Sequence, residues 1–177
     1  MSKTFANWSG LVQRTPQEIL EISTIQDAQK AVSIANKSKA PITTIGSSHS
    51  HSRLIQNNTG IIIRTDQVKG TITINESDKT ATVPSGMKLK EAAKSLWDKG
   101  YAFSNQGDVD VQSIAGLIGT GVHGTGITHP SISTYVQDAT IITSTSDIVK
   151  ASESNELLEA TRLNLGAIGP VSYTHLR

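Results

Sequence analysis

The sequence contains no cysteine, so disulfide bonds, thiolate catalysis and cysteine-based zinc sites are all excluded. Charge of one sign is not in excess either, because 16 lysines and arginines oppose 15 aspartates and glutamates without a basic or an acidic block. Binding of nucleic acid needs clustered cations, so no nucleic-acid partner is expected. Aromatic residues make up only 4% of the chain, too few for a surface on which unpaired bases stack.

Long apolar runs are also missing. No stretch approaches the roughly 20 apolar residues of a membrane-spanning helix, and the first ten residues lack the apolar core of a signal peptide. We therefore expect a cytoplasmic protein with no strong membrane signal. With 177 residues, the chain is long enough to form one domain, or two small lobes, around a substantial core.

The first third of the chain has the pattern of a β-α-β unit. Residues 19–22 have the composition of a short strand. Ser23 and Thr24, followed by Gln26 and Asp27, offer a helix start of the capping-box kind. Apolar residues then recur at helical spacing up to residue 35, and residues 42–45 form a second strand that enters a turn at Gly46. This pattern predicts a small N-terminal lobe over residues 1–58.

The rest of the chain predicts a larger lobe over residues 59–170, with a mixed, mostly antiparallel sheet and flanking helices. The fold class is therefore α/β (α+β). The expected elements are strands at 61–64, 71–75, 80–83, 101–103, 136–143 and 148–151, and helices at 89–97 and 153–163. Residues 104–133 are rich in glycine and serine and predict a loop so long that a bound ligand would be needed to order it.

Two glycine-rich blocks carry most of the functional information. In the first, residues 45–50, a strand runs into a Gly-Ser-Ser turn that presents His49. Backbone N–H groups of such a turn could hold a phosphate, with an imidazole beside it. The second block, QSIAGLIGTGVHGTG at residues 112–126, could let the backbone approach a large planar cofactor. Together the two blocks indicate a flavin site, although each block alone is also consistent with an ordinary glycine-rich turn.

The second block offers an alternative interpretation as a dinucleotide-binding fingerprint. Residues 119–124 match GxGxxG, and Asp138 lies near the expected distance for the ribose-binding acid. The fingerprint must open a helix directly after the first strand of a β-α-β unit. The residues that follow here include Pro130 and are poor helix formers, so a Rossmann site is disfavoured.

Two further sets of residues suggest other chemistry. Four histidines, at positions 49, 51, 123 and 129, could be imagined as a metal cluster, but carboxylates at ligand spacing are missing and we expect no metal. Asp108 and Asp110 would face opposite ways in an extended segment, which disfavours a hydrolytic pair. Asp108 remains a candidate for the substrate side of a cofactor cavity.

Four motifs in order resemble the flavin-binding domain of the vanillyl-alcohol oxidase family, a PCMH-type FAD-binding domain, in its branch of sugar-1,4-lactone and alditol oxidases. Residues 7–10 resemble the start of that branch, and residues 45–50 resemble its GSGHS phosphate turn, with Ser48 in place of a glycine. Residues 105–116 resemble the NLGDIDxQSIAG stretch of aldonolactone oxidases, and residues 121–126 resemble the shared GTHGTG. The resemblance covers nearly the whole chain.

The resemblance implies an FAD cofactor whose diphosphate lies on the turn after Gly46 and whose 8α-methyl carbon is bonded covalently to His49. It places Gly107 at the point where O2 reaches the flavin. The implied reaction oxidises an alcohol of a sugar-acid lactone, as in D-arabinono-1,4-lactone oxidase, by hydride transfer to the flavin, and O2 then gives H2O2. The residues implied to bind FAD are Ile45, Gly46, Ser47, Ser48, His49, Ser50, Ser113, Gly116, Thr120, Gly121, His123, Gly124 and Thr125.

The sequence departs from the family pattern at two places. Ser48 would crowd the phosphate turn if that position needs a positive φ. Residues 170–177 do not match the strand and the long substrate-binding cap with which the family continues, so we expect 171–177 to be a non-native tail, the cap to be absent and this chain alone to be inactive. The alternatives are an alditol oxidase that acts on a polyol and, from another class, a flavin-binding module without catalysis. Membrane association is implied by the family resemblance alone.

Overall fold

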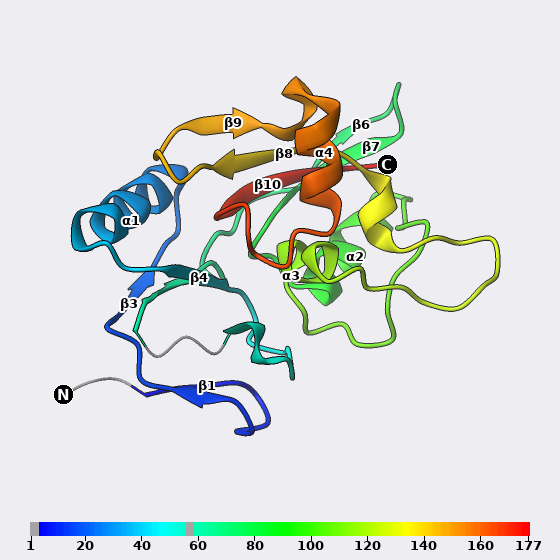
Figure 1. Ribbon diagram of the computed structural model, residues 1–177. Helices are drawn as coiled ribbons and strands as arrows, with labels where there is room; N and C mark the ends of the chain where they lie inside the picture. Colours follow the sequence, from blue (N-terminus) through cyan, green and yellow to red (C-terminus); the bar gives the residue numbers. More distant parts are fainter. Residues whose placement is uncertain (1–3, 56–58) are drawn as a thin grey trace.

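The computed structural model describes residues 4–55 and 59–177. Figure 1 shows two lobes, each built on its own sheet, and a short N-terminal ribbon beside the first lobe. The first sheet has three strands and the second has five. The expected fold class, a small β-α-β lobe followed by a larger and mostly antiparallel one, is confirmed.

The first lobe is a parallel sheet covered by one helix. Its strands β3 (Glu18–Glu21), β4 (Ile42–Ile45) and β5 (Ile61–Arg64) lie in the order β3-β5-β4, and all pair in parallel. Helix α1 (Ile25–Ser38) begins with the predicted capping box, in which Thr24 accepts from the backbone N–H of Asp27. The apolar face of α1 packs against the sheet, through Ala28, Ala31, Val32 and Ala35.

The central position of β5 corrects the expected lobe boundary at residue 58. Strand β5 lies between β3 and β4, and its three isoleucines are at most 1% exposed. A continuous apolar run is typical of a strand that has parallel neighbours on both edges and is covered on both faces. The first lobe therefore includes β5, which the sequence analysis assigned to the second lobe.

A two-stranded ribbon of β1 (Phe5–Ala6) and β2 (Gln13–Arg14) precedes the first lobe and was not expected from the sequence. The guanidinium of Arg14 lies over the Phe5 ring, 5.8 Å from its centroid, and donates to the Thr43 hydroxyl at 3.3 Å. Burial lowers the pKa of Arg14 to about 10. The ribbon therefore packs on the face of the first sheet opposite α1, where Phe5 and Val12 meet Ile62 of the central strand (Figure 1).

The second lobe is a five-stranded antiparallel sheet with β10 (Val171–Leu176) at its centre. β10 pairs with β7 on one side and with β8 on the other, in the order β6-β7-β10-β8-β9. The remaining strands are β6 (Thr73–Asn75), β7 (Thr80–Pro84), β8 (Val136–Ile142) and β9 (Ile148–Lys150). The second lobe thus runs to residue 176, and its expected end at residue 170 is corrected because the segment taken for a tail fills the centre of the sheet. Whether residues 171–177 are native to the gene stays a prediction.

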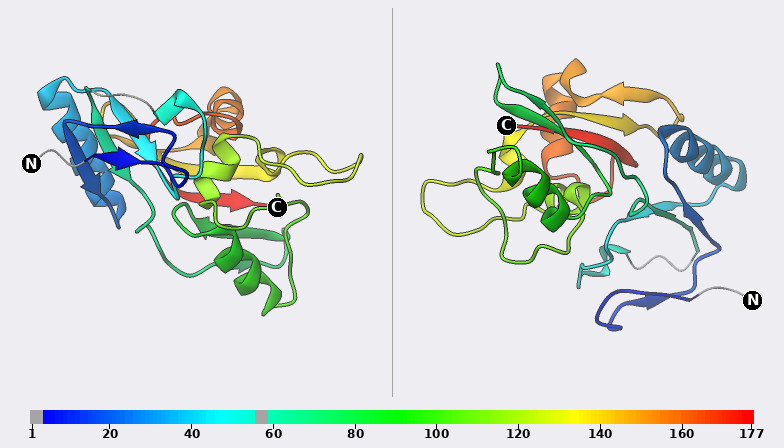
Figure 2. Two further views of the ribbon diagram at one scale, coloured as in Figure 1. Left: turned by 90° about the horizontal axis from the view of Figure 1, so that it is seen from below. Right: turned by 180° about the vertical axis from the view of Figure 1, so that it is seen from behind.

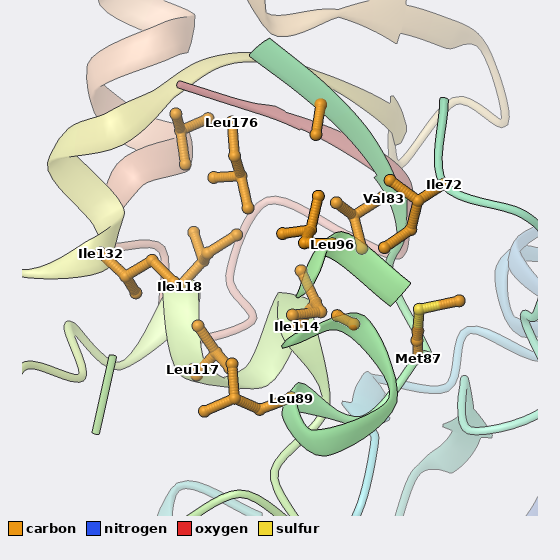
Figure 3. Close-up of a cluster of buried hydrophobic side chains, with 13 residues drawn as sticks. Ile72, Val83, Met87, Leu89, Leu96, Ile114, Leu117, Ile118, Ile132 and Leu176 are labelled. Carbon is orange, nitrogen blue, oxygen red and sulfur yellow. The ribbon is translucent and has the colours of Figure 1, made fainter. Parts of the chain in front are cut away.

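Helices α2 (Leu89–Trp97), α3 (Ile114–Gly119) and α4 (Asn155–Arg162) flank this sheet. Figure 3 shows the core that α2 and α3 form with β7 and β10; it extends from Leu89 and Leu117 at one end to Leu176 at the other. The views in Figure 2 show α1 and α2 at opposite ends of the molecule. Among the described helices, none is both long enough and apolar enough to cross a membrane.

The expected loop over residues 104–133 was wrong at two places. It contains α3 and a short 3-10 helix, η2 (Ile132–Tyr135). In α3, Ile114, Leu117 and Ile118 lie at helical spacing and are at most 1% exposed, so burial outweighs the low helix propensity of the glycines around them. The expected strand at 101–103 does not form, and two further 3-10 turns lie at Arg53–Ile55 (η1) and Ala151–Glu153 (η3).

Candidate functional site

A cavity of about 500 Å³ is lined by residues of both lobes. Such a volume is typical of pockets that hold a small molecule or a cofactor. From the first lobe come the end of β4 and the turn after it, residues 44–51, with Leu54 and Thr65. From the second lobe come Val109, Gln112, Ser113, Ala115, Gly116, Gly119, Thr120, Asn164, Leu165, Gly166, Gly169 and Val171.

The turn after β4 presents its backbone to the cavity. The Thr65 backbone N–H donates to the carbonyl of Ile45 at 2.9 Å, which fixes the point where the strand ends. Among the described residues, none accepts a hydrogen bond from the backbone N–H groups of residues 47–50. These donors are therefore available to an anion such as a phosphate. Ser48 has a φ of 56°, so the position that the family pattern fills with glycine does adopt the left-handed conformation.

The start of α3 lies directly against this turn. A Cβ atom placed on Gly46 would meet the Ser113 hydroxyl oxygen at 2.0 Å and the Ser113 Cβ at 2.8 Å. Ser113 is 2% exposed and also limits the space at Gly116, where a Cβ would lie 2.9 Å from the same oxygen. The two glycine-rich blocks therefore meet at one point of the cavity, and the glycine at position 46 is what lets them approach.

Two buried polar atoms of the cavity wall lack a protein partner. Within the described part of the chain, neither the Ser47 hydroxyl nor Gln112 Oε1 makes a hydrogen bond. Buried polar groups are nearly always paired, and an unpaired one costs about 1–3 kcal/mol. A hydroxyl that can donate and a carbonyl that can accept are thus unpaired in residues of the cavity wall, beside a turn of free N–H groups. This donor set fits a ligand that carries both a phosphate and a polar ring, as FAD does.

Two histidines lie at the cavity beside the N-terminal ribbon. The His49 ring is stacked on the Trp8 indole, with 4.7 Å between centroids and planes 6° apart. His51 meets the same indole edge-on, at 5.3 Å and 79°. His123 and His129 belong to another loop, and His123 Nδ1 lies 3.0 Å from the Gly124 carbonyl. Within residues 4–55 and 59–177, no three His, Asp or Glu side chains are grouped as metal ligands would be.

The structure brings nine of the predicted cofactor-binding residues to the cavity wall and leaves the others away from it. Those at the wall are Ile45, Gly46, Ser47, Ser48, His49, Ser50, Ser113, Gly116 and Thr120. The other four, Gly121, His123, Gly124 and Thr125, lie away from it, as do Gly107 and Asp108, which were predicted for oxygen access and for the substrate side. The cofactor-binding role of all thirteen residues, and the roles of Gly107 and Asp108, stay predictions.

Close packing against neighbouring loops accounts for two of the glycines that lie away from the cavity. A Cβ on Gly107 would meet the Val122 side chain at 2.6 Å, and a Cβ on Gly124 would meet the Gln106 carbonyl at 2.2 Å. Asn105 holds these loops together, since its Nδ2 donates to the Pro130 carbonyl at 2.8 Å and its Oδ1 accepts from the Gly124 N–H. The loops around these two glycines are thus in close contact, which a larger side chain would disturb.

One side of the cavity, residues 164–171, was not predicted from the sequence. The Leu165 N–H donates to the carbonyl of Gly119 at 3.0 Å, which ties this segment to the end of α3. Leu165 has a φ of 50°, Gly166 of 82° and Gly169 of 107°, so three residues close together use the left-handed region. The run of glycines at 166 and 169 was the available signal of a chain that must approach a ligand or another backbone closely.

Comparison with known proteins gives the family. A family model described as "FAD binding domain" matches residues 16–152. The chain is 28% identical, over 97% of its length, to an L-gulonolactone oxidase of Scyliorhinus torazame. It is also 28% identical, over 98% of its length, to a D-arabinono-1,4-lactone oxidase of Kluyveromyces lactis, and over its full length to an L-gulono-1,4-lactone dehydrogenase of Mycobacterium tuberculosis.

Solved structures share the fold. A xylooligosaccharide oxidase from Myceliophthora thermophila superposes with a TM-score of 0.88 at 20% identity, covering 97% of this chain and 37% of that one. A chitooligosaccharide oxidase superposes with a TM-score of 0.85, also at 20% identity, covering 99% of this chain and 40% of that one. At this identity the likeness concerns the fold alone.

The chain spans only part of these relatives: 39% of the Scyliorhinus protein, 34% of the Kluyveromyces protein and 41% of the Mycobacterium protein. The resemblance to a flavin-binding domain, expected from the motifs, is confirmed by the family model. Because that model matches well over half of the chain, this protein belongs to the FAD binding domain family.

Proposed function

We propose that this chain is the FAD-binding part of a flavin-dependent oxidase that oxidises an alcohol of a sugar-acid lactone. The observation that carries the proposal is the meeting of the two glycine-rich blocks, through Gly46 and Ser113, at a cavity with unpaired polar atoms. The sugar-lactone substrate rests on the relatives, which are named L-gulonolactone and D-arabinono-1,4-lactone oxidases. The whole enzyme would need the part that those relatives have beyond this chain.

The residues at the cavity have distinct roles in holding FAD. The free N–H groups of residues 47–50 bind the diphosphate, which is the charged part of the cofactor. The Ser47 hydroxyl and Gln112 Oε1 gain the hydrogen bonds that they lack within the protein. When bound, the flavin supplies the acceptor for a hydride from the substrate alcohol, and the protein supplies orientation and exclusion of water.

His49 is the proposed point of covalent attachment to FAD. It lines the cavity directly after the phosphate-binding turn, and no described residue forms a hydrogen bond with either of its ring nitrogens. Attachment would join a ring nitrogen to the flavin's 8α-methyl carbon. One hydrogen leaves the methyl group and one leaves the imidazole, and the two electrons pass through the flavin to O2, which leaves as H2O2.

The choice of oxidase over dehydrogenase rests on Gly107, and Asp108 is proposed on the substrate side. Neither residue lines the cavity in this chain, and Gly107 is packed against Val122. The part of the relatives that lies beyond this chain would complete the substrate side. A flavin-binding module without catalysis is the second candidate, favoured by the observation that neither Gly107 nor Asp108 lines the cavity.

Thermal unfolding of the chain with added FAD tests the cofactor site. A ligand that binds only the folded state at a hundredfold excess over its Kd stabilises by about 2.7 kcal/mol. For a domain of this size, that corresponds to a rise in Tm of about 5 to 10 °C. A Tm that does not move across a titration with FAD would contradict the site.

Flavin fluorescence of the denatured protein tests the covalent attachment of FAD, and peroxide formation from a lactone tests the oxidase reaction. We expect wild-type chain incubated with FAD in air to keep flavin fluorescence in a denaturing gel, and His49→Ala to lose it while His51→Ala keeps it. Fluorescence that persists in His49→Ala would move the attachment to another residue. Peroxide formation from D-arabinono-1,4-lactone or L-gulono-1,4-lactone, by the chain joined to the matching remainder of a relative, separates the oxidase from the module without catalysis.

A further inference from the structure

The N-terminal ribbon holds the turn that carries His49 at two points. The Trp8 backbone N–H donates to the carbonyl of Ser48 at 3.1 Å, and Asn7 Nδ2 donates to the carbonyl of Ser50 at 3.0 Å. These two carbonyls belong to the residues on either side of His49. The ribbon therefore fixes the backbone of the turn immediately before and immediately after the histidine.

Asn7 is itself rigidly placed. It is 4% exposed, and its Oδ1 accepts from the backbone N–H of Val12 across the ribbon at 3.1 Å. The Asn7 backbone N–H donates to the Val12 carbonyl at 2.9 Å. Both the backbone and the side chain of Asn7 are therefore held by Val12, which fixes the amide that donates to Ser50.

The Trp8 side chain completes the arrangement by stacking on the imidazole. The planes of the two rings are 6° apart, with 4.7 Å between their centroids. A stack covers one face of the imidazole and leaves both ring nitrogens free at its edge. Since no described residue forms a hydrogen bond with the His49 nitrogens, the indole is what fixes the plane of the ring.

From these contacts we infer that Trp8 is a positioning residue for the covalent attachment of FAD: it holds the His49 imidazole with its ring nitrogens directed edge-on into the cavity. The inference rests on the proposed function, because it concerns the step that His49 performs there. The reacting atoms and electrons are those given above for attachment, with O2 as the acceptor. Trp8 itself lies outside the wall of this cavity and touches no reacting atom.

Because the Trp8 side chain is exposed, the role of its ring can be tested without disturbing the core. The residue is 58% exposed, so its removal leaves no hole in the core, and its backbone hydrogen bond to Ser48 remains in every variant. Trp8→Ala removes the stack, and Trp8→Phe keeps a smaller ring. Leu11→Ala is the matched control, because Leu11 lies in the same ribbon and is an apolar side chain that is 81% exposed.

The first measurement needs no flavin. In the proton NMR spectrum of the apo-protein, the indole ring current should shift the His49 ring protons upfield. We expect the shift to disappear in Trp8→Ala, to persist in part in Trp8→Phe and to be unchanged in Leu11→Ala. His49 resonances at ordinary positions in the wild type would overturn the inference.

The second measurement follows attachment. Apo-protein is mixed with FAD in air, samples are denatured at intervals, and gel fluorescence gives the attached fraction. We expect attachment about three- to tenfold slower in Trp8→Ala, the range that an aromatic pair supplies, with partial recovery in Trp8→Phe and the wild-type rate in Leu11→Ala. The rise in Tm with FAD before attachment should be the same in all four proteins.

The outcomes separate this inference from the proposed function. Attachment at the wild-type rate in Trp8→Ala would overturn the role of Trp8 and leave the FAD site intact. Wild-type chain that binds FAD without attaching it would overturn both the attachment and the role of Trp8. A wild type that does not bind FAD at all would overturn the proposed function itself.

Discussion

The contact between Gly46 and Ser113 allows a quantitative test of how the two lobes meet. Gly46→Ala places a Cβ where the Ser113 hydroxyl oxygen lies 2.0 Å away and its Cβ 2.8 Å away. Gly46 does not have a positive φ, so alanine is conformationally allowed there and the effect is steric. Inserting a methyl group into a filled space typically costs about 1–3 kcal/mol.

The net effect on stability is smaller than this cost. Replacing glycine with alanine at a permitted φ stabilises by roughly 0.4–1 kcal/mol through the unfolded chain. We therefore expect Gly46→Ala to destabilise by about 1–2 kcal/mol, which lowers Tm by about 2 to 8 °C in a domain of this size. The matched control is Gly70→Ala, where the new Cβ would lie at an ordinary 3.4 Å from Pro84 and Tyr173.

Substitutions at Ser113 then show whether contact with its side chain is what destabilises Gly46→Ala. Ser113→Ala removes the nearer atom and should recover part of the stability of Gly46→Ala, whereas Ser113→Gly removes both atoms and should recover most of it. The interaction free energy of the double-mutant cycle should be about 1–2 kcal/mol. The assay is thermal or urea unfolding of the apo-protein, followed by circular dichroism.

Additivity would refute the reasoning. If the two substitutions combine within about 0.5 kcal/mol, the residues do not share a contact, and the blocks do not meet as described. Repeating the measurement with FAD separates packing from binding, because Gly46→Ala should also reduce the Tm rise on FAD addition when the displaced serine enters the cavity.

Two further predictions concern other parts of the chain. Gly107→Ala should lower the Tm of the apo-protein, because its Cβ would meet Val122 at 2.6 Å, and Val122→Ala should restore it; an unchanged Tm would contradict this packing. Hydrogen bonds from Thr24 and Ser23 lower the pKa of Asp27 from 3.8 to about 2. A carboxyl whose pKa is depressed by folding stabilises above its unfolded pKa and loses that effect as pH falls through its folded pKa. Asp27→Asn should therefore be less stable than wild type at neutral pH, and the difference in Tm should shrink between pH 4 and pH 2; a constant difference would contradict the capping role.

Helices α1 and α2 could be predicted from local sequence signals. The capping box of Thr24 and Asp27 fixed where α1 begins, and the apolar spacing of α2 with Gly100 after it fixed where that helix ends. Helix α3 was not predicted, because its apolar residues stand among glycines and only tertiary burial decides its conformation. Propensity is a weak prior wherever a short helix is fully covered.

Only one wall of the cavity could be predicted from the sequence. The turn at residues 45–50 follows its strand directly, so a sequence pattern marks it. The opposite wall, residues 164–171, reaches the cavity only because β10 is inserted between β7 and β8. In β10 the buried positions include Ser172 and Thr174, which blurs the alternation of apolar and polar residues that identifies a strand.

The central place of β10 also governs the order in which the chain can fold during synthesis. The hairpins β6-β7 and β8-β9 form from neighbouring residues, but they share no edge until β10 enters between them. The β7–β10 pairing joins residues about ninety positions apart, such as Val83 and Thr174, and contacts of this length are slow to form. As the chain emerges from the ribosome, the first lobe can therefore complete its sheet early, while the second lobe holds open strand edges until residue 176 is released. Until then β7 and β8 each present an open strand edge, and an open edge is where another strand can pair wrongly.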